Sequence, residues 1–416
     1  MKNFSFCLMM TLSTSITFAQ TGTFNIQTAT WSIGNAATHN CTWNDPVLTV
    51  NSGADIIITG TVSNGRRMVI TSYASVTLEN LSITVNNANE AALQHNGSTL
   101  YLTLLGENFL QSGSGCAGIQ IPYVMSSLYF NEESTGNLTT KGGNNASGIS
   151  NCFIHIFGGT INATGGNNGA GIEGGGTIAI IAGTVNANGG SGGAGIGGSY
   201  KNSGGRIIIK GGTINATGGS NGAGIGGGDL GESGTIVISD GNITATGGDK
   251  GAGIGGGNGT ITINGGTIYA KGENGGAGIG GNRGGSGDTI IIYNGVITAT
   301  GSNGAAGIGT GISPFAGGGV IAIHGGTLPK VVIKAPASAV EKQGVLFTAA
   351  HTVLFVQLIF SAVQSTPQAV LARRTSAEVV LVHIGMSSLM AASSPPWVLM
   401  VFGAFAMAIW VPVGIR

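Results

Sequence analysis

Charged residues are scarce in this chain. Only 8% of its 416 residues are Asp, Glu, Lys or Arg, and 16 basic and 16 acidic side chains give a formal net charge of zero. A protein that binds a polyanion through bulk charge needs a basic excess. The composition excludes that class, and we expect no nucleic-acid partner.

Cysteine and histidine are also few. Four cysteines occur. Cys7 falls in a leader segment, which leaves Cys41, Cys116 and Cys152, and no Cys-x-x-Cys pair exists. The six histidines have no metal-ligand spacing, so neither a zinc site nor a disulfide framework is expected. We expect small buried thiols, with a Cys116–Cys152 bridge between nearby coils as the alternative.

The first residues have the pattern of a secretory signal. Lys2 provides the charged start, Phe4–Phe18 is apolar to neutral, and Ala19 is a suitable residue before cleavage. We therefore expect residues 1–19 to be a signal peptide and the protein to be secreted or exposed at the cell surface.

Glycine, in contrast, is abundant, with 79 residues. The chain lacks the Gly-X-Y period of collagen, and its Ile, Val and Ala content argues against disorder. The stretch Asn168–Ile172 (NGAGI) recurs in exact or looser form, and its last residue, Ile or Leu, stands at positions 93, 119, 149, 172, 196, 225, 254, 279 and 308. A self-similar period of this size predicts a solenoid.

Each repeat contains three apolar pieces: a TI-x-I run such as Thr260–Ile263, a GTI-x-A run such as Gly212–Ala216, and the AGI marker. Apolar residues alternate with period two, which indicates strands. The sequence thus predicts an all-β protein, a parallel β-helix with three-strand coils of about 23–30 residues. The crossover rule for parallel strands predicts a right-handed helix.

We expect four segments. These are a signal peptide (1–19), an N-terminal cap with irregular coils (20–110), regular Gly-rich coils (111–330) and an irregular, apolar C-terminal tail (331–416). The repeat breaks at Leu328–Lys334. Trp397–Val413 carries no charge and is near the lower length limit of a membrane span. The tail is predicted to be either a membrane anchor or a poorly ordered appendage, such as the product of a reading-frame shift.

Part of the chain resembles a known family. The run from Leu105 to Pro122 matches its pattern at Gly106, Asn108, Leu110, Gly113, Gly115, Ala117, Gly118 and Ile119, and repeats such as GGTINATGGSNGAGIGGG follow. Over residues 50–330 the chain is similar to the secreted β-helix carbohydrate-binding domains of bacterial surface proteins. The resemblance implies a right-handed β-helix that binds polysaccharides such as cellulose or polygalacturonate, with calcium as a candidate cofactor. Between Leu128 and Leu138 the pattern fails, and we expect a bulge or loop there.

The outward side chains of the GTI-x-A strands are mainly Thr and Asn, which can bind sugar hydroxyls. A solvated strand face and an ice-like lattice are the alternatives. The variable corner after the marker carries charges, including Asp288, that we expect to be solvated; two of them, Arg206 and Arg283, could hold a uronate carboxylate. The candidate carbohydrate-binding residues are Thr160, Asn162, Thr164, Asn186, Asn188, Thr213, Asn215, Thr217, Thr244, Thr246, Tyr269, Lys271, Arg206 and Arg283.

Catalysis is not expected. Glycoside hydrolysis needs two carboxyl groups that converge within about 5–10 Å, and no coil carries two acidic residues on one outward strand. No calcium-loop motif is present either. The sequence predicts a non-catalytic, extracellular polysaccharide-binding module, with an adhesin-like surface solenoid or an ice-binding solenoid as alternatives.

Overall fold

The computed structural model describes residues 21–63, 65–150, 153–312 and 319–325 with their side chains. From residue 327 onwards it describes the backbone of strands β32 to β38. The predicted signal peptide, Asn64 and Cys152 lie outside the described residues. Cys41 and Cys116 are free, buried thiols, and burial raises the pKa of Cys41 to about 12.

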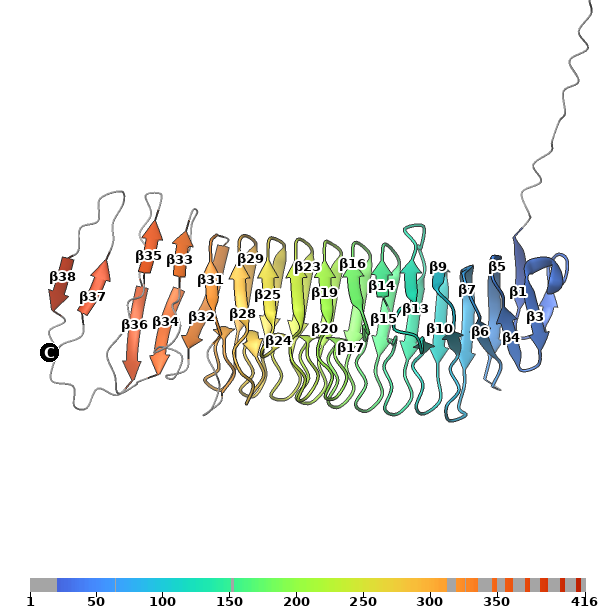
Figure 1. Ribbon diagram of the computed structural model, residues 1–416, viewed down its shortest axis with the longest axis horizontal. Coiled ribbons are helices and arrows are strands. Elements are labelled where there is room, and N and C mark those ends of the chain that lie inside the picture. Colours follow the sequence, from blue (N-terminus) through green and yellow to red (C-terminus); the bar gives the residue numbers. More distant parts are fainter. Residues whose placement is uncertain are drawn as a thin grey trace, which may run out of the picture.

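The described chain is an all-β parallel solenoid of about nine turns, as the sequence predicts. The helical element among the described residues is a single turn, η1 (Ala37–His39). In Figure 1 the coils follow one another along one long axis, from the blue N-terminal end to the orange C-terminal coils. Most coils contribute one strand to each of three faces.

Face 1 is formed by the TI-x-I strands and their upstream equivalents. They are β9 (Thr99–Leu105), β12 (Ser127–Phe130), β14 (Phe153–Ile156), β16 (Thr177–Ile180), β19 (Arg206–Ile209), β22 (Thr235–Ile238), β25 (Thr260–Ile263), β28 (Thr289–Ile292) and β31 (Ile321–Ile323).

Face 2 is formed by the GTI-x-A strands and their upstream equivalents. They are β10 (Glu107–Gln111), β13 (Asn137–Lys141), β15 (Thr160–Thr164), β17 (Thr184–Asn188), β20 (Thr213–Thr217), β23 (Asn242–Thr246), β26 (Thr267–Lys271) and β29 (Val296–Thr300). The predicted interruption upstream of β13 is a loop over residues 131–136, and β12 before it is regular.

Face 3 carries the marker residues on short strands. They are β6 (Arg67–Ile70), β8 (Leu93–His95), β11 (Ile119–Gln120), β18 (Ile196–Gly197), β21 (Ile225–Gly226), β24 (Ile254–Gly256), β27 (Ile279–Gly281) and β30 (Ile308–Gly309). Isolated bridges through Ile149 and Ile172 join β11 to β18.

The marker residues form one continuous inner column. Parallel pairing joins Met68 to Leu93 and Leu93 to Ile119, and the same register runs on to Ile308. All of these side chains are fully buried. The predicted stacking of isoleucines is confirmed, and burial of apolar surface along this column holds successive coils together.

The N-terminal end closes differently from the rest of the rod. After β1 (Gly22–Asn25), strand β2 (Thr30–Trp31) pairs antiparallel with it, and β3 (Cys41–Asn44) forms an antiparallel hairpin with β4 (Val47–Val50). The ring of Phe24 lies 4.9 Å from that of Trp31 and 5.2 Å from that of Trp43, between ring centroids. This segment therefore supplies the bulk that the Gly-rich coils lack.

The guanidinium of Arg66 ties this hairpin to the first coils. Its Nε and Nη2 donate to the two carboxylate oxygens of Asp45 at 3.0 and 2.9 Å, and Nη1 donates to the carbonyls of Ile26 and Gln27. Two long strands follow, β5 (Ala54–Val62) and β7 (Ala74–Thr84), each of which crosses from face 1 to face 2. The cap and the first coils thus form one packed unit.

A second column lies at the corner just before the AGI marker. Its residues have φ between +60° and +100° in every coil: Asn89, Gly115, Asn145, Asn168, Gly192, Asn221, Lys250, Gly275 and Gly304. Only Gly, and less readily Asn, adopts this left-handed conformation at low cost. The corner thus explains why NG and GG dipeptides recur here, and Lys250 is the exception in the column.

Lys250→Asn should stabilise the protein by about 1 kcal/mol, because Asn tolerates the left-handed conformation better than Lys. Lys250 pairs only with exposed Asp249 at 3.8 Å, a contact that contributes little. Urea unfolding of both proteins measures the difference. Asn221→Lys, the reverse change one coil earlier, should destabilise; equal effects of the two substitutions would contradict this assignment.

The repeat ends in sequence at Leu328–Lys334, yet parallel pairing continues. Strand β32 (Thr327–Ala335) spans the break and pairs with both β29 and β30, with a register shift between Val296 and Thr298. The following strands are β33 (Leu346–Ala349), β34 (Val356–Ser361), β35 (Leu371–Arg374), β36 (Val382–Ser387), β37 (Trp397–Met400) and β38 (Ile409–Pro412). In the described part of the chain no helix is long and apolar enough to cross a membrane.

Candidate functional site

The outer surface of face 2 is a polar platform of three columns. Because side chains alternate across a strand, Ile161 and Ala163 point into the core while their neighbours point outward. The first column is Thr160, Thr184, Thr213, Asn242, Thr267 and Val296; the second is Asn162, Asn186, Asn215, Thr244, Tyr269 and Thr298; the third is Thr164, Asn188, Thr217, Thr246, Lys271 and Thr300. The structure therefore brings the predicted face 2 residues together.

Part of the middle column is a hydrogen-bonded amide ladder. Asn186 Nδ2 donates to Asn162 Oδ1 at 2.8 Å, and Asn215 Nδ2 donates to Asn186 Oδ1 at 2.8 Å. The parallel register at a strand spacing of about 4.8 Å makes such contacts possible. The ladder fixes the orientation of three amides that the sequence alone leaves free.

The ladder leads to a shallow depression of about 190 Å³. It is lined by Thr213, Asn215, Asn242, Ile243, Thr244, Thr267, Ile268, Tyr269, Val296 and Thr298. This volume is below the roughly 300–1,000 Å³ of sites that enclose a small ligand. The depression can therefore seat part of an extended chain but not a whole small molecule.

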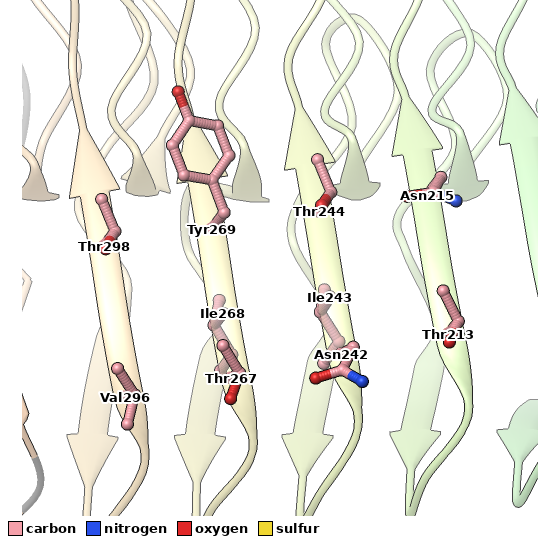
Figure 2. Close-up of a pocket in the computed structure, with 10 residues that line it drawn as sticks. All are labelled: Thr213, Asn215, Asn242, Ile243, Thr244, Thr267, Ile268, Tyr269, Val296 and Thr298. Carbon is pink, nitrogen blue, oxygen red and sulfur yellow. The ribbon is translucent and has the colours of Figure 1, made fainter.

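Tyr269 is the aromatic residue of this depression. In Figure 2 its ring is seen nearly face-on above β26, with Thr244 and Thr298 on the adjacent strands, and 44% of the residue is exposed. In a stack of aromatic side chains each ring covers the face of the next, whereas one face of the Tyr269 ring is turned toward the solvent. It can therefore stack against the apolar face of a flat ligand.

The platform carries little net charge. Lys271 in the third column pairs with the carboxylate of Glu273, and that hydrogen bond raises the pKa of the Lys271 ammonium. Among the three columns from β15 to β29, the remaining side chains are uncharged. The ion pair is exposed, so it contributes little to stability.

The two predicted arginines do not join the platform. Arg206 begins β19 on face 1, where its strand neighbours are Thr177 and Thr235. Arg283 lies in the loop after β27, and its backbone N–H donates to the carbonyl of Lys250 at 2.9 Å. The sequence placed both at the variable corner after the marker; Arg283 lies there, whereas Arg206 is the first residue of the following face 1 strand.

Asp288 is also placed differently from the prediction. Only 1% of this residue is exposed, and Gly259 N–H donates to its Oδ1 at 2.7 Å. Burial raises the pKa of the Asp288 carboxyl, and the Gly259 hydrogen bond opposes that effect. The side chain was expected to be solvated at the corner; instead it is buried, and its hydrogen bond to Gly259 links two neighbouring coils.

Among the described residues, no group of three or more His, Cys, Asp or Glu side chains is placed to hold a metal ion. The corner carboxylate of Asp249 accepts a hydrogen bond from Asn274 Nδ2 at 2.7 Å. Calcium requires several oxygen ligands. Asp249 acts here as part of the corner's hydrogen bonding.

Sequence reasoning missed an aromatic stack on face 1. The rings of Tyr101 and Tyr129 lie 4.9 Å apart, and those of Tyr129 and His155 lie 4.6 Å apart, nearly parallel in both pairs. Tyr73 meets Tyr101 edge-on at one end. These residues recur in the sequence at about the coil interval, and that spacing is the signal from which the stack could have been predicted. Because the rings cover one another's faces, the stack stabilises neighbouring coils and offers no broad ring face to a ligand.

Comparison with known proteins agrees with this fold. Segments 207–229, 236–258, 261–285 and 290–312 match the family model for a β-helix repeat. Neither the curated proteins nor the solved structures contain a significant match to the chain. Each matched segment covers a face 1 strand, a face 2 strand and a marker of the parallel stack described above. The chain therefore folds as a parallel β-solenoid in which four segments match the β-helix repeat.

Proposed function

We propose that this protein is a non-catalytic binding module for a polysaccharide, and that the outer surface of face 2 is its binding platform. The observation that carries this proposal is Tyr269, an exposed ring laid broadside among hydroxyl and amide side chains. Sugar rings have one apolar face and a rim of hydroxyls. An aromatic face flanked by hydrogen-bonding groups complements both features.

The shape of the platform favours a polymer over a small sugar. The depression is shallow, while the Thr and Asn columns run across the strands from β15 to β29. A linear chain laid along the rod axis would meet equivalent Thr and Asn side chains at every coil. Many weak contacts of this kind add up only for an extended ligand.

The absence of carboxylates from the platform columns between β15 and β29 supports a binding role without catalysis. The signal-like segment 1–19 supports an extracellular location, where polysaccharides occur. A surface solenoid without a dedicated ligand is the alternative compatible with the same fold. The ice-lattice alternative is weakened by Asn242, Tyr269 and Val296, which interrupt the Thr ranks.

Tyr269→Ala should weaken polysaccharide binding at least about tenfold, because an exposed ring at the centre of a contact surface is a typical energetic hot spot. A screen of immobilised plant and microbial glycans, with and without calcium, identifies a ligand, and affinity electrophoresis then measures the variant. Release of the bound ligand by a chelator would show that calcium takes part.

Tyr73→Ala is the matched control. Tyr73 is 49% exposed, close to the value for Tyr269, but lies at the edge of the aromatic stack away from face 2. This variant should bind as the unmodified protein does. Absence of binding to every glycan, or equal losses for both variants, would overturn the assignment of face 2.

A further inference from the structure

The amide ladder on face 2 has a direction. Each amide donates its Nδ2 hydrogen toward the N-terminal end of the rod, from Asn215 to Asn186 and from Asn186 to Asn162. The carbonyl of the last amide must then point the other way. In Figure 2 the nitrogen of Asn215 lies on the side away from Thr244, so that its Oδ1 lies on the side of the depression.

Aligned amides polarise one another. When an amide donates a hydrogen bond through its N–H, its own carbonyl oxygen becomes more negative and therefore a stronger acceptor. The ladder therefore places the negative end of three aligned dipoles at the rim of the depression. Asn215 Oδ1 is the atom that carries this effect to a ligand.

The other groups of the depression carry no charge. The face of the Tyr269 ring is electron-rich, and the Thr244 and Thr267 hydroxyls and the Asn242 amide can donate or accept. Lysine and arginine are missing from its lining, and the nearest platform cation, Lys271, is already paired with Glu273. A carboxylate on the ligand would therefore meet the Asn215 acceptor and neutral hydrogen-bonding groups, with no free cation in the lining to balance its charge.

We infer that the platform selects neutral, hydroxyl-rich polysaccharides and discriminates against uronate polymers. This inference rests on the proposed function. Hydroxyls donate to Asn215 Oδ1, whereas a uronate carboxylate facing the same atom is repelled and loses its hydration. The expected discrimination differs from the polygalacturonate binding that the family resemblance implies.

The test compares two polymers with the same backbone. Affinity electrophoresis is run with polygalacturonate and with carboxyl-reduced polygalacturonate, in which each carboxylate has become a hydroxymethyl group; hydroxyethylcellulose serves as a second neutral polymer. The dissociation constant obtained from the retardation should be at least fivefold lower for the two neutral polymers than for polygalacturonate. Asn215→Lys should lose most of this preference, because it replaces the acceptor with a cation.

Thr235→Lys is the control. It adds the same charge to an exposed position of face 1, outside the platform and the lining of the depression, and should keep the preference for neutral polymers. Equal or stronger retardation by polygalacturonate would overturn the inference and leave the proposed function intact. Retardation by none of the three polymers, together with an empty glycan screen, would overturn the proposed function itself.

Discussion

Gly219→Ala should destabilise the protein by more than about 3 kcal/mol, the upper range for overpacking in a rigid site. A methyl group on Gly219 would overlap the carbonyl oxygen of Gly190 in the preceding coil. The same contact repeats at Gly190 and Gly248, so the backbone of each coil rests on the one before. Neither coil can move away without breaking the parallel hydrogen bonds on both sides.

Urea unfolding followed by circular dichroism measures this loss. Gly284→Ala is the control, because a methyl group there meets no atom within 4 Å although φ is +83°. It should cost only the roughly 1–2 kcal/mol of the left-handed conformation. If Gly219→Ala were as mild as Gly284→Ala, close backbone packing could not be what requires glycine at this corner.

His95→Ile should abolish a loss of about 3 kcal/mol in the free energy of unfolding that the unmodified protein suffers as the pH falls from 6.5 to 4. His95 is fully buried, neither ring nitrogen has a hydrogen-bond partner, and burial lowers its pKa to about 4 from an ordinary value near 6.5. The unfolded chain therefore takes up a proton at a higher pH than the folded one. Stability is complete above pH 6.5 and is lost as the pH falls toward 4, by about 3 kcal/mol in total.

Isoleucine is the natural replacement at this position. His95 pairs with Ile70 in the preceding coil, and Ile121 occupies the equivalent place in the following one, both fully buried. His95→Ile completes an apolar column and removes two polar atoms without partners, each of which costs about 1–3 kcal/mol. At pH 7.5 the variant should be at least as stable as the unmodified protein.

Unfolding free energies at pH 7.5, 6, 5 and 4 test this prediction. The difference between the two proteins should widen as the pH falls from 6.5 to 4. His155→Gln is the comparison: burial lowers the pKa of His155 as well, but this ring is only partly buried, so its contribution to the acid limb should be smaller. A constant difference between His95→Ile and the unmodified protein across this range would contradict the assignment.

The sequence alone determined the architecture and the composition of the platform. Strand side chains alternate with period two, so Ile161 had to face the core once Asn162 faced the solvent. The recurring marker set the length of each coil, which placed Ile196 on Ile225 and Asn186 on Asn215. These relations depend only on local geometry and on a repeat length, both of which can be read directly.

The tertiary structure decided what depends on contacts between coils. The direction of the amide ladder, the stacking of Tyr129 on His155 and the broadside ring of Tyr269 depend on rotamers that neighbouring coils select. Corner loops differ in length, so their geometry follows from packing and not from the period. For that reason Asp288 is buried where solvation was predicted, and Arg206 begins a face 1 strand while Arg283 stays at the corner.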